Sequence, residues 1–250
     1  MKCVNESPSV VALSGGIGGA KLAMGLYNTY SSRSLMIIGN IGDDFEHYGL
    51  HISPDLDTLM YTISGNSDTE KGWGLAEESW NCMESLERLG GETWFNLGDK
   101  DLATHLERTR RIMAGESLTE ITSDFCRKFK ISAQILPVSN DSVKTIVETE
   151  NGDMDFQNYF VRDQCKAIVS GFRFEGSSQA EPNPLFMEAL SDPSLRAVVI
   201  CPSNPFLSID PMLAIRGVRE KLRDCSAPVI AVTPIINGNA VKGPTAKIIR

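Results

Sequence analysis

Several patterns that identify common protein classes are missing from the 250-residue sequence. Its six cysteines include no CxxC pair, which argues against a zinc site, an iron–sulfur cluster or dithiol chemistry. No stretch approaches the roughly 18 apolar residues of a membrane helix. The first apolar run, residues 10–13, is too short for a signal peptide and breaks into glycines. We therefore expect a cytoplasmic protein with reduced thiols and no membrane contact.

A basic surface and the usual hydrolase motifs are also missing. The chain has 24 Lys and Arg against 32 Asp and Glu, and its net charge of −8 argues against nucleic-acid binding. Neither GxSxG nor HExxH occurs, and all three histidines precede residue 106, so nucleophilic hydrolase chemistry has little support. What remains is a globular chain that can bind a small anionic substrate through local donors and a metal.

Four short apolar runs dominate what is present, at residues 9–13, 34–38, 196–201 and 228–232. Continuous apolar strands are typical of a mostly parallel sheet that helices cover on both faces. The first run leads through a glycine turn into a helical pattern, which is the first unit of a doubly wound α/β fold. Ligands of such folds bind beyond the carboxyl ends of the strands. We therefore expect a single domain over residues 1–250, with a site where the loops after these strands meet.

The pattern changes between about residues 65 and 132. Helix-like spacing at residues 75–89, 101–113 and 118–129, with glycines as stops, predicts a helical insertion that caps the sheet. Residues 135–175 are predicted to form β-rich segments with a turn at residues 151–153. We expect three arginines of the insertion to lie on an exposed helix face rather than in a phosphate clamp: Arg108, Arg110 and Arg111.

The glycine turn is the first candidate binding element. Its glycines are Gly15, Gly16, Gly18 and Gly19. They let the backbone approach a ligand, and the helix start that follows offers N–H groups to an anion. The turn is not a Walker A motif, because Ala20 precedes Lys21, and it is not GxGxxG, because Lys21 replaces the third glycine. The alternative is a tight strand–helix turn without a ligand.

A cluster of acidic residues follows the second apolar run. Its members are Asp43, Asp44, Asp55 and Asp57, with His47 and His51 between them. Carboxylates near phosphate groups commonly hold Mg²⁺, and acids this close in sequence call for a compensating cation. The alternative is that Asp55 caps a helix and that the other acids are solvated. Each histidine is expected to be a solvated or packing residue.

Two further features can contact a planar or hydroxylated ligand. All three tryptophans, Trp73, Trp80 and Trp94, fall in the predicted insertion. Their rings can stack on a heterocycle, or they can pin the insertion onto the sheet. Ser203 and Asn204 follow the third apolar run and can bind a hydroxyl or a base edge, although the same residues are common turn formers.

A series of short motifs, spread over nearly the whole chain, occurs in the order known from one family. They are Ser14-Gly-Gly-Ile-Gly-Gly-Ala-Lys21, Asn40-Ile-Gly-Asp-Asp44, Pro54-Asp-Leu-Asp-Thr58, Gly72-Trp-Gly74, Gly98-Asp-Lys-Asp-Leu-Ala-Thr-His105, Pro202-Ser-Asn-Pro205 and Pro234-Ile-Ile236. Together they resemble the 2-phospho-L-lactate transferase family of coenzyme F420 biosynthesis. The resemblance implies a Rossmann-like core with a helical insertion, an Mg²⁺ requirement and a homodimer.

The resemblance also implies a reaction. A phosphate-linked small acid moves from a guanosine diphosphate-activated donor to the ribityl hydroxyl of the deazaflavin Fo, and GMP leaves. Phosphoryl transfer of this kind depends on charge neutralisation and in-line positioning. The donated acid stays open among phospholactate, phosphoenolpyruvate and phosphoglycerate, because pocket details distinguish acids that differ by a hydroxyl or a double bond.

Residues at positions that match the family motifs receive roles from the same resemblance. Those implied for substrate binding are Gly15, Gly16, Gly18, Gly19, Lys21, Asn40, Trp73, Ser203 and Asn204. Those implied for Mg²⁺ binding are Asp43, Asp44, Asp55 and Asp57. The implied catalytic residues, one of which accepts the proton of the Fo hydroxyl, are Asp43, Asp44 and Asp57.

The end of the chain departs from the family pattern. Members of the family continue for some tens of residues past the equivalent of residues 234–236, whereas this chain stops at Arg250. Residues 242–245 also differ from the methionine- and alanine-containing pattern that the family implies. We therefore expect either a C-terminus that is truncated relative to the family or a divergent member of it.

Two other classes of function stay open. A non-catalytic, nucleotide-sugar-binding regulator of the same superfamily shares the glycine-rich start, but it can dispense with the metal carboxylates and the Trp-rich insertion. An NAD-type dehydrogenase needs GxGxxG and an acidic residue about 20 residues beyond the glycines. Asp43 and Asp44 stand near that position, but the glycine spacing is wrong.

Overall fold

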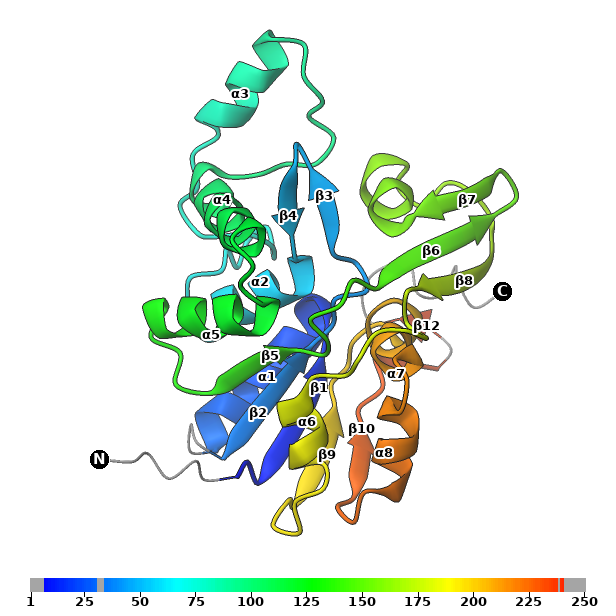
Figure 1. Ribbon diagram of the computed structural model, residues 1–250. Coiled ribbons are helices and arrows are strands. Elements are labelled where there is room, and N and C mark those ends of the chain that lie inside the picture. Colours follow the sequence, from blue (N-terminus) through cyan, green and yellow to red (C-terminus); the bar gives the residue numbers. More distant parts are fainter. Residues whose placement is uncertain (1–6, 31–33, 238, 241–250) are drawn as a thin grey trace.

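The computed structural model describes residues 7–30, 34–237 and 239–240, and its centre is a five-stranded parallel sheet (Figure 1). In spatial order the strands are β10 (Val229–Ala231), β9 (Ala197–Ile200), β1 (Val10–Ser14), β2 (Leu35–Gly39) and β5 (Gln134–Pro137). The predicted α/β class is confirmed, and all four predicted strands belong to this sheet. The fifth strand, β5, starts the segment predicted as β-rich and pairs with β2. Residues 242–245, which depart from the family pattern, lie outside the described residues.

The register of the sheet brings the strand ends level. β1 and β2 are buried along their whole length, as their continuous apolar sequences predict. Ser14 pairs with Gly39, and Gly39 in turn pairs with Pro137. On the other side of β1, Leu13 pairs with Ile200 at the end of β9. The glycine turn, the loop after β2 and the loop after β9 therefore leave the sheet side by side.

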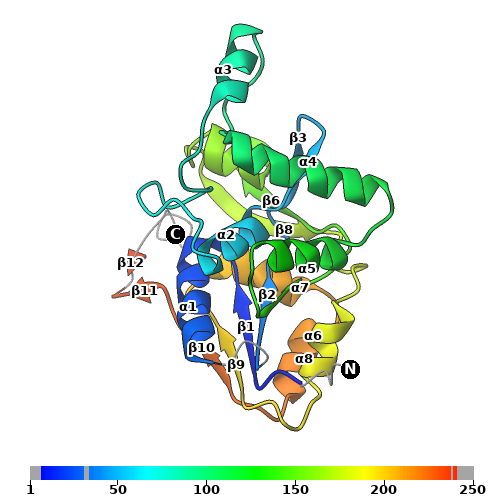
Figure 2. The ribbon, with the colours of Figure 1, turned by 90° about the vertical axis from the view of Figure 1, so that its left-hand side faces the viewer.

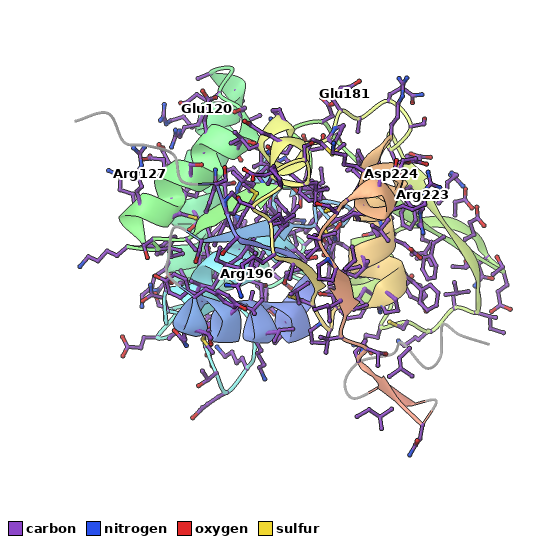
Figure 3. All side chains as sticks on the ribbon, turned by 90° about the horizontal axis from the view of Figure 1, so that it is seen from below. Glu120, Arg127, Glu181, Arg196, Arg223 and Asp224 are labelled. Carbon is purple, nitrogen blue, oxygen red and sulfur yellow. The ribbon has the colours of Figure 1, made fainter. Side chains whose placement is uncertain are left out.

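Helices cover both faces of the sheet. Figure 2 shows α1 (Gly16–Thr29) on one face, and α6 (Pro184–Ala189) and α8 (Val218–Asp224) on the other. α2 (Pro54–Ile63) packs against α1 near the carboxyl ends of the strands, and α7 (Asp210–Ala214) precedes α8. Charged side chains of the outer helices, such as Arg127 and Arg223, extend outward at the periphery of Figure 3. This arrangement leaves the apolar strands as the core.

The helical insertion contains three helices, α3 (Asn81–Arg88), α4 (Asp99–Met113) and α5 (Leu118–Lys128). The prediction for α4 and α5 is accurate to a few residues, but α3 begins six residues later than the predicted start at residue 75. Before α3 the chain turns repeatedly, because the Asp68 carboxylate accepts hydrogen bonds from the N–H groups of Glu70 and Lys71. Gly72 and Gly74 continue this turn at positive φ.

Small antiparallel sheets complete the fold. One is the hairpin of β3 (Phe45–His47) and β4 (Leu50–Ile52). A three-stranded sheet joins β7 (Gly152–Asp155), β6 (Lys144–Thr149) and β8 (Val169–Glu175), and a further pair joins β11 (Ile235–Ile236) and β12 (Asn239–Ala240). Single π-type turns lie at η1 (Asn158–Arg162) and η2 (Pro205–Ile209). Among the described residues, no helix is long and apolar enough to cross a membrane.

Candidate active site

The loops at the carboxyl end of the sheet are joined by buried hydrogen bonds. The N–H of Gly15 donates to Ser203 Oγ at 3.0 Å, which connects the loops after β1 and β9. The N–H of Gly16 donates to the carboxylate of Asp55, the second residue of α2. Asn40 Nδ2 donates to Asp55 Oδ2 at 3.0 Å and so adds the loop after β2. Three predicted site elements therefore form one connected structure.

The glycine turn is tight because protein groups pack against it. A Cβ on Gly15 would collide with the Asp55 carboxylate and Ser208, and a Cβ on Gly19 would collide with Ser203 Oγ. Gly16 has a φ of +63°, a conformation that favours glycine. Asp55 also places a negative charge at the start of α1, where a helix favours an anion. The N–H of Gly16 is thus already bonded within the protein, whereas Lys21 is exposed on α1.

Three carboxylates gather beside this turn, and we call Asp43, Asp44 and Asp55 the acid trio. Burial, followed by the charges of Asp55 and Asp44, raises the pKa of Asp43 well above its usual value. Burial also raises the pKa of Asp44, and it raises the pKa of Asp55 to about 6. In the described part of the chain, neither Asp43 nor Asp55 forms an ion pair. Asp43 and Asp55 are therefore buried carboxyl groups without a charged partner among the described side chains.

Asp44 is oriented from the hairpin side. Its Oδ2 accepts a hydrogen bond from Ser53 Oγ at 2.7 Å and lies 3.3 Å from His51 Nε2. Its Oδ1 is buried and has no hydrogen-bond partner among the described residues. A buried carboxylate oxygen without a partner is costly, and a divalent cation bound by oxygen ligands would satisfy it. The buried Oδ1 of Asp44 is therefore a candidate ligand atom for Mg²⁺.

Asp57 points away from the acid trio and binds Arg108 of α4. Both carboxylate oxygens of Asp57 contact the guanidinium, one of them at 3.1 Å from Nη1. Arg108 is only 1% exposed, so the expectation that it lies on an exposed helix face is wrong. Burial lowers the pKa of Arg108, but the charge and hydrogen bonds of Asp57 outweigh this and raise it. Asp57 is therefore neutralised from within the protein.

Two other residues complete this buried group next to Asp57. His105 Nδ1 lies 3.7 Å from Asp57 Oδ2, and His105 Nε2 lies 3.4 Å from Asp101 Oδ1. Tyr61 donates from its hydroxyl to Asp101 Oδ1 at 2.6 Å. One ligand atom each from Asp57, Asp101 and His105 lies within 4.8 Å of the others. The fold therefore contains a second acidic group, and in this one a guanidinium is already present.

A sequence signal for this second group exists in α4. Asp101, His105 and Arg108 are spaced four and three residues apart, which places them on one face of a helix. Of the other two arginines expected to be exposed, Arg110 pairs with Glu107 at the surface. Arg111 is largely covered and pairs with Glu116 and Asp124.

Trp73 and Trp80 pack against each other, and Trp94 packs against the β3–β4 hairpin. Trp73 is 41% exposed, and its ring centroid is 6.1 Å from that of Trp80. Trp94 packs edge-on against the ring of His47, with 5.1 Å between the ring centroids. Asn204 caps η2, since its Oδ1 accepts from the N–H groups that follow it. A stacking role is thus not evident from these contacts.

A cavity with a volume of about 580 Å³ lies elsewhere, between η1 and the three-stranded sheet. Arg173 lines it, but this guanidinium is engaged by Glu148, Asp153 and Glu175. Arg162 also lines it. Parallel α/β folds bind ligands beyond the carboxyl ends of their strands, so the loops there are the candidate active site.

Comparison with known proteins places this arrangement in a family. Residues 10–250 match the family model described as 2-phospho-L-lactate transferase CofD. The phosphoenolpyruvate transferase of Streptomyces coelicolor is 38% identical over 245 residues, which are 96% of this chain and 76% of that protein. The phosphoenolpyruvate transferase of Mycolicibacterium smegmatis is 39% identical over 250 residues, covering 94% and 76% of the two chains.

A solved structure of protein BH3568 from Bacillus halodurans shares the fold. It superposes with a TM-score of 0.62 at 18% identity, covering 90% of this chain and 68% of that one. At this identity the likeness concerns the fold alone. The family match and the curated relatives, in contrast, both extend over nearly the whole sequence. The chain belongs to the CofD family of transferases, the family of coenzyme F420 biosynthesis that its motifs resemble.

Proposed function

We propose that this transferase moves a phosphate-linked small acid from a guanosine diphosphate-activated donor to the ribityl hydroxyl of the deazaflavin Fo. The hydroxyl oxygen attacks the phosphorus that carries the acid, the phosphoanhydride bond to guanylate breaks, and GMP leaves. The observation that carries the proposal is the buried acid trio beside the glycine turn, at the carboxyl end of the sheet. Such a site suits a diphosphate that arrives with a divalent cation.

In this proposal Asp43, Asp44 and Asp55 hold Mg²⁺, which neutralises the charge on the diphosphate when it is bound. Asp43 is the proposed proton acceptor for the Fo hydroxyl. Burial, followed by the charges of Asp55 and Asp44, raises its pKa well above the usual value, as suits a group that accepts a proton. Asn40 orients Asp43 and Asp55 through its amide nitrogen.

The remaining predicted residues take supporting roles. Asp57 is proposed to position α2, because Arg108 contacts both of its carboxylate oxygens. The N–H groups at the start of α1 and Lys21 are proposed to meet the donor phosphates, and Ser203 and Asn204 the nucleotide or acceptor. Trp73, which is half-exposed, is proposed to flank a ring of one substrate.

The names of the relatives favour one donor. The curated relatives from Streptomyces coelicolor and Mycolicibacterium smegmatis are both phosphoenolpyruvate transferases, and they are more than a third identical to this chain. We therefore propose the guanylylated phosphoenolpyruvate derivative as the preferred donor over the phospholactate and phosphoglycerate derivatives.

The test is a direct assay with Fo, Mg²⁺ and each of the three guanylylated acids in turn. We expect a more polar deazaflavin product and an equal amount of GMP, formed fastest from the phosphoenolpyruvate donor. GMP without a deazaflavin product would mean hydrolysis and would contradict the transfer. Nucleotide binding without any product would contradict it as well and would favour the regulator.

The organisation of the protein is proposed alongside its reaction. We propose one Rossmann-like domain over residues 1–250 with a helical insertion at about residues 65–132, in a cytoplasmic homodimer. Sedimentation of the purified chain tests the dimer, since a single species with the mass of one chain contradicts it.

A further inference from the structure

The group formed by Asp57, Asp101 and His105 has the composition of a divalent metal site. Two carboxylate oxygens and an imidazole nitrogen lie within 4.8 Å of one another, and all three residues are buried. Zinc, manganese and other divalent ions are commonly bound by such mixed oxygen and nitrogen ligands. The group comes from two elements only, α2 and one face of α4, and Figure 2 shows α4 above α2.

Arg108 engages the lone pairs that a metal ion in this group would use. Its guanidinium contacts both oxygens of Asp57, and its Nη1 lies 3.2 Å from His105 Nδ1. A guanidinium only donates hydrogen bonds, so Nδ1 is the acceptor in this contact. One carboxylate and the imidazole lone pair are therefore occupied by a cation that belongs to the chain.

Among the described residues, the acid trio forms no ion pair with an arginine or a lysine. Asp43 and Asp55 form no ion pair in the described part of the chain, and Asp44 keeps a buried oxygen without a hydrogen-bond partner. The two acidic groups thus differ in the source of positive charge. The chain supplies an arginine to the group on α4, whereas, among the described residues, the acid trio has only the His51 imidazole beside Asp44.

Arg108 also reaches the wall of the acid trio. Its Nη1 donates to the backbone carbonyl oxygen of His51 at 3.4 Å, and the ring of His51 lies 3.3 Å from the Asp44 carboxylate. One buried side chain on α4 therefore bonds to α2 through Asp57 and to β4 through His51. These are the two elements that carry or orient Asp55 and Asp44.

We propose that Arg108 is a positioning residue that occupies the place of a divalent cation in the group of Asp57, Asp101 and His105. It thereby confines metal binding to the acid trio and fixes the elements that carry it. This inference rests on the proposed function in one respect, because the proposed function assigns the metal to the acid trio. The role of Arg108 in its own group does not depend on which acid is transferred.

The test counts Mn²⁺ ions bound per chain, by the loss of the electron paramagnetic resonance signal of free Mn²⁺. Arg108→Met removes the cation and keeps an apolar stem, and this variant should bind one more Mn²⁺ than the unchanged chain. The double variant Arg108→Met/His105→Ala should return to the original number, because a ligand is gone. Arg108→Lys keeps a positive charge and should also keep the original number.

Arg110→Met is the matched control, because Arg110 lies on the same helix but pairs with Glu107 at the surface. It should leave the number of bound Mn²⁺ unchanged. A folded Arg108→Met variant that binds no additional Mn²⁺ overturns the inference. Near-ultraviolet circular dichroism establishes whether the variant is folded.

A second variant keeps the inference testable if Arg108→Met does not fold. Asp101→Asn leaves Arg108 and Asp57 in place and removes only a carboxylate that, on this inference, binds no metal. It should change neither the number of bound Mn²⁺ nor their affinity, and the loss of one Mn²⁺ overturns the inference. The proposed transfer reaction can fail separately, since an unchanged chain that binds Mn²⁺ but forms no product leaves these counts intact.

Discussion

Two aspartates of one motif have opposite surroundings, because two residues on a helix differ in direction by about 200°. Asp55 faces the glycine turn and Asn40, and Asp57 faces Arg108. The sequence places both near the carboxyl end of the sheet. Which of them is left without a counter-charge depends on α4, more than 40 positions further along the chain.

Asp55→Asn should abolish transfer and remove part of the pH dependence of the stability of the metal-free protein. Burial raises the pKa of Asp55 from 3.8 to about 6. The folded state therefore holds a proton that the unfolded state loses, so the free energy of unfolding falls as pH rises from about 4 to about 6. Over this window the loss is up to about 3 kcal/mol. Urea titrations in a chelator at both ends of the window should show the fall, and Asp55→Asn should lack this part of it.

Added Mg²⁺ is the control for this experiment. A bound cation favours the ionised carboxylate and should reduce the fall in stability of the unchanged chain at neutral pH. If Asp55→Asn shows the same pH dependence as the unchanged chain, Asp55 does not carry the buried charge assigned to it.

Asp57→Asn should lower the free energy of unfolding by about 3–5 kcal/mol, because it leaves the buried guanidinium of Arg108 without its carboxylate. Both partners are buried, with side-chain exposures of 7% and 1%. Glu107→Gln removes a partner of Arg110 at the surface of the same helix and should have no measurable effect. Denaturant unfolding of both variants checks the expectation, and equal effects would contradict the buried pair.

At the scale of elements, the glycines of the glycine turn and α1 differ in whether the surrounding protein leaves room for a side chain. A Cβ at Gly19 meets Ser203 and Ser14, whereas a Cβ at Gly25 meets nothing within 4 Å. The first glycine is required by close packing of the loops after β1 and β9. The second is a helix-interior glycine whose backbone freedom only weakens α1.

Gly19→Ala should therefore lower the free energy of unfolding by about 1–3 kcal/mol through overpacking, and it should slow transfer. Gly25→Ala is the matched control on the same helix and should raise stability by about 0.5–1 kcal/mol without affecting transfer. Thermal unfolding and the transfer assay measure both. If Gly25→Ala also slowed transfer, the loss could not be assigned to the turn.

The elements predictable from the sequence are those that local patterns define. Apolar runs predicted β1, β2, β9 and β10, and the glycine stops bounded α4 and α5, because strand burial and helix ends depend on neighbouring residues. Arg108 was predicted as exposed because a single sequence does not state which face of α4 is covered. The contact between Arg108 of α4 and Asp57 of α2 shows which face of α4 is buried. Asp101 and His105 lie on the same face of the helix.

At the scale of the whole molecule, one edge of the main sheet is exposed. All residues of β10 are exposed, and Ile230 has half of its surface accessible, whereas β1 and β2 are buried throughout. β10 pairs only with β9 among the described strands. Apolar residues on an open strand edge favour association with another chain. The chain spans about three quarters of the length of the curated relatives it matches.

Ile230→Lys should reduce self-association of the chain at high concentration and lower its binding of a hydrophobic dye. A charge on an edge strand opposes pairing between strands of different molecules. The side chain is half-exposed, so the free energy of unfolding should change little. Light scattering over a concentration series measures the effect. Unchanged scattering would mean that β10 is not the surface through which the chains associate.

The ion pair between α2 and α4 has a consequence for engineering. Arg108 stands within the segment that caps the sheet, and its carboxylate partner stands in the motif next to the acid trio. A chimera that exchanged this segment for that of a distant homologue would import or delete a charge at the centre of the protein. Such chimeras should retain activity only when the inserted segment supplies an equivalent guanidinium. The helical insertion and the loops that carry the acid trio should therefore be exchanged together.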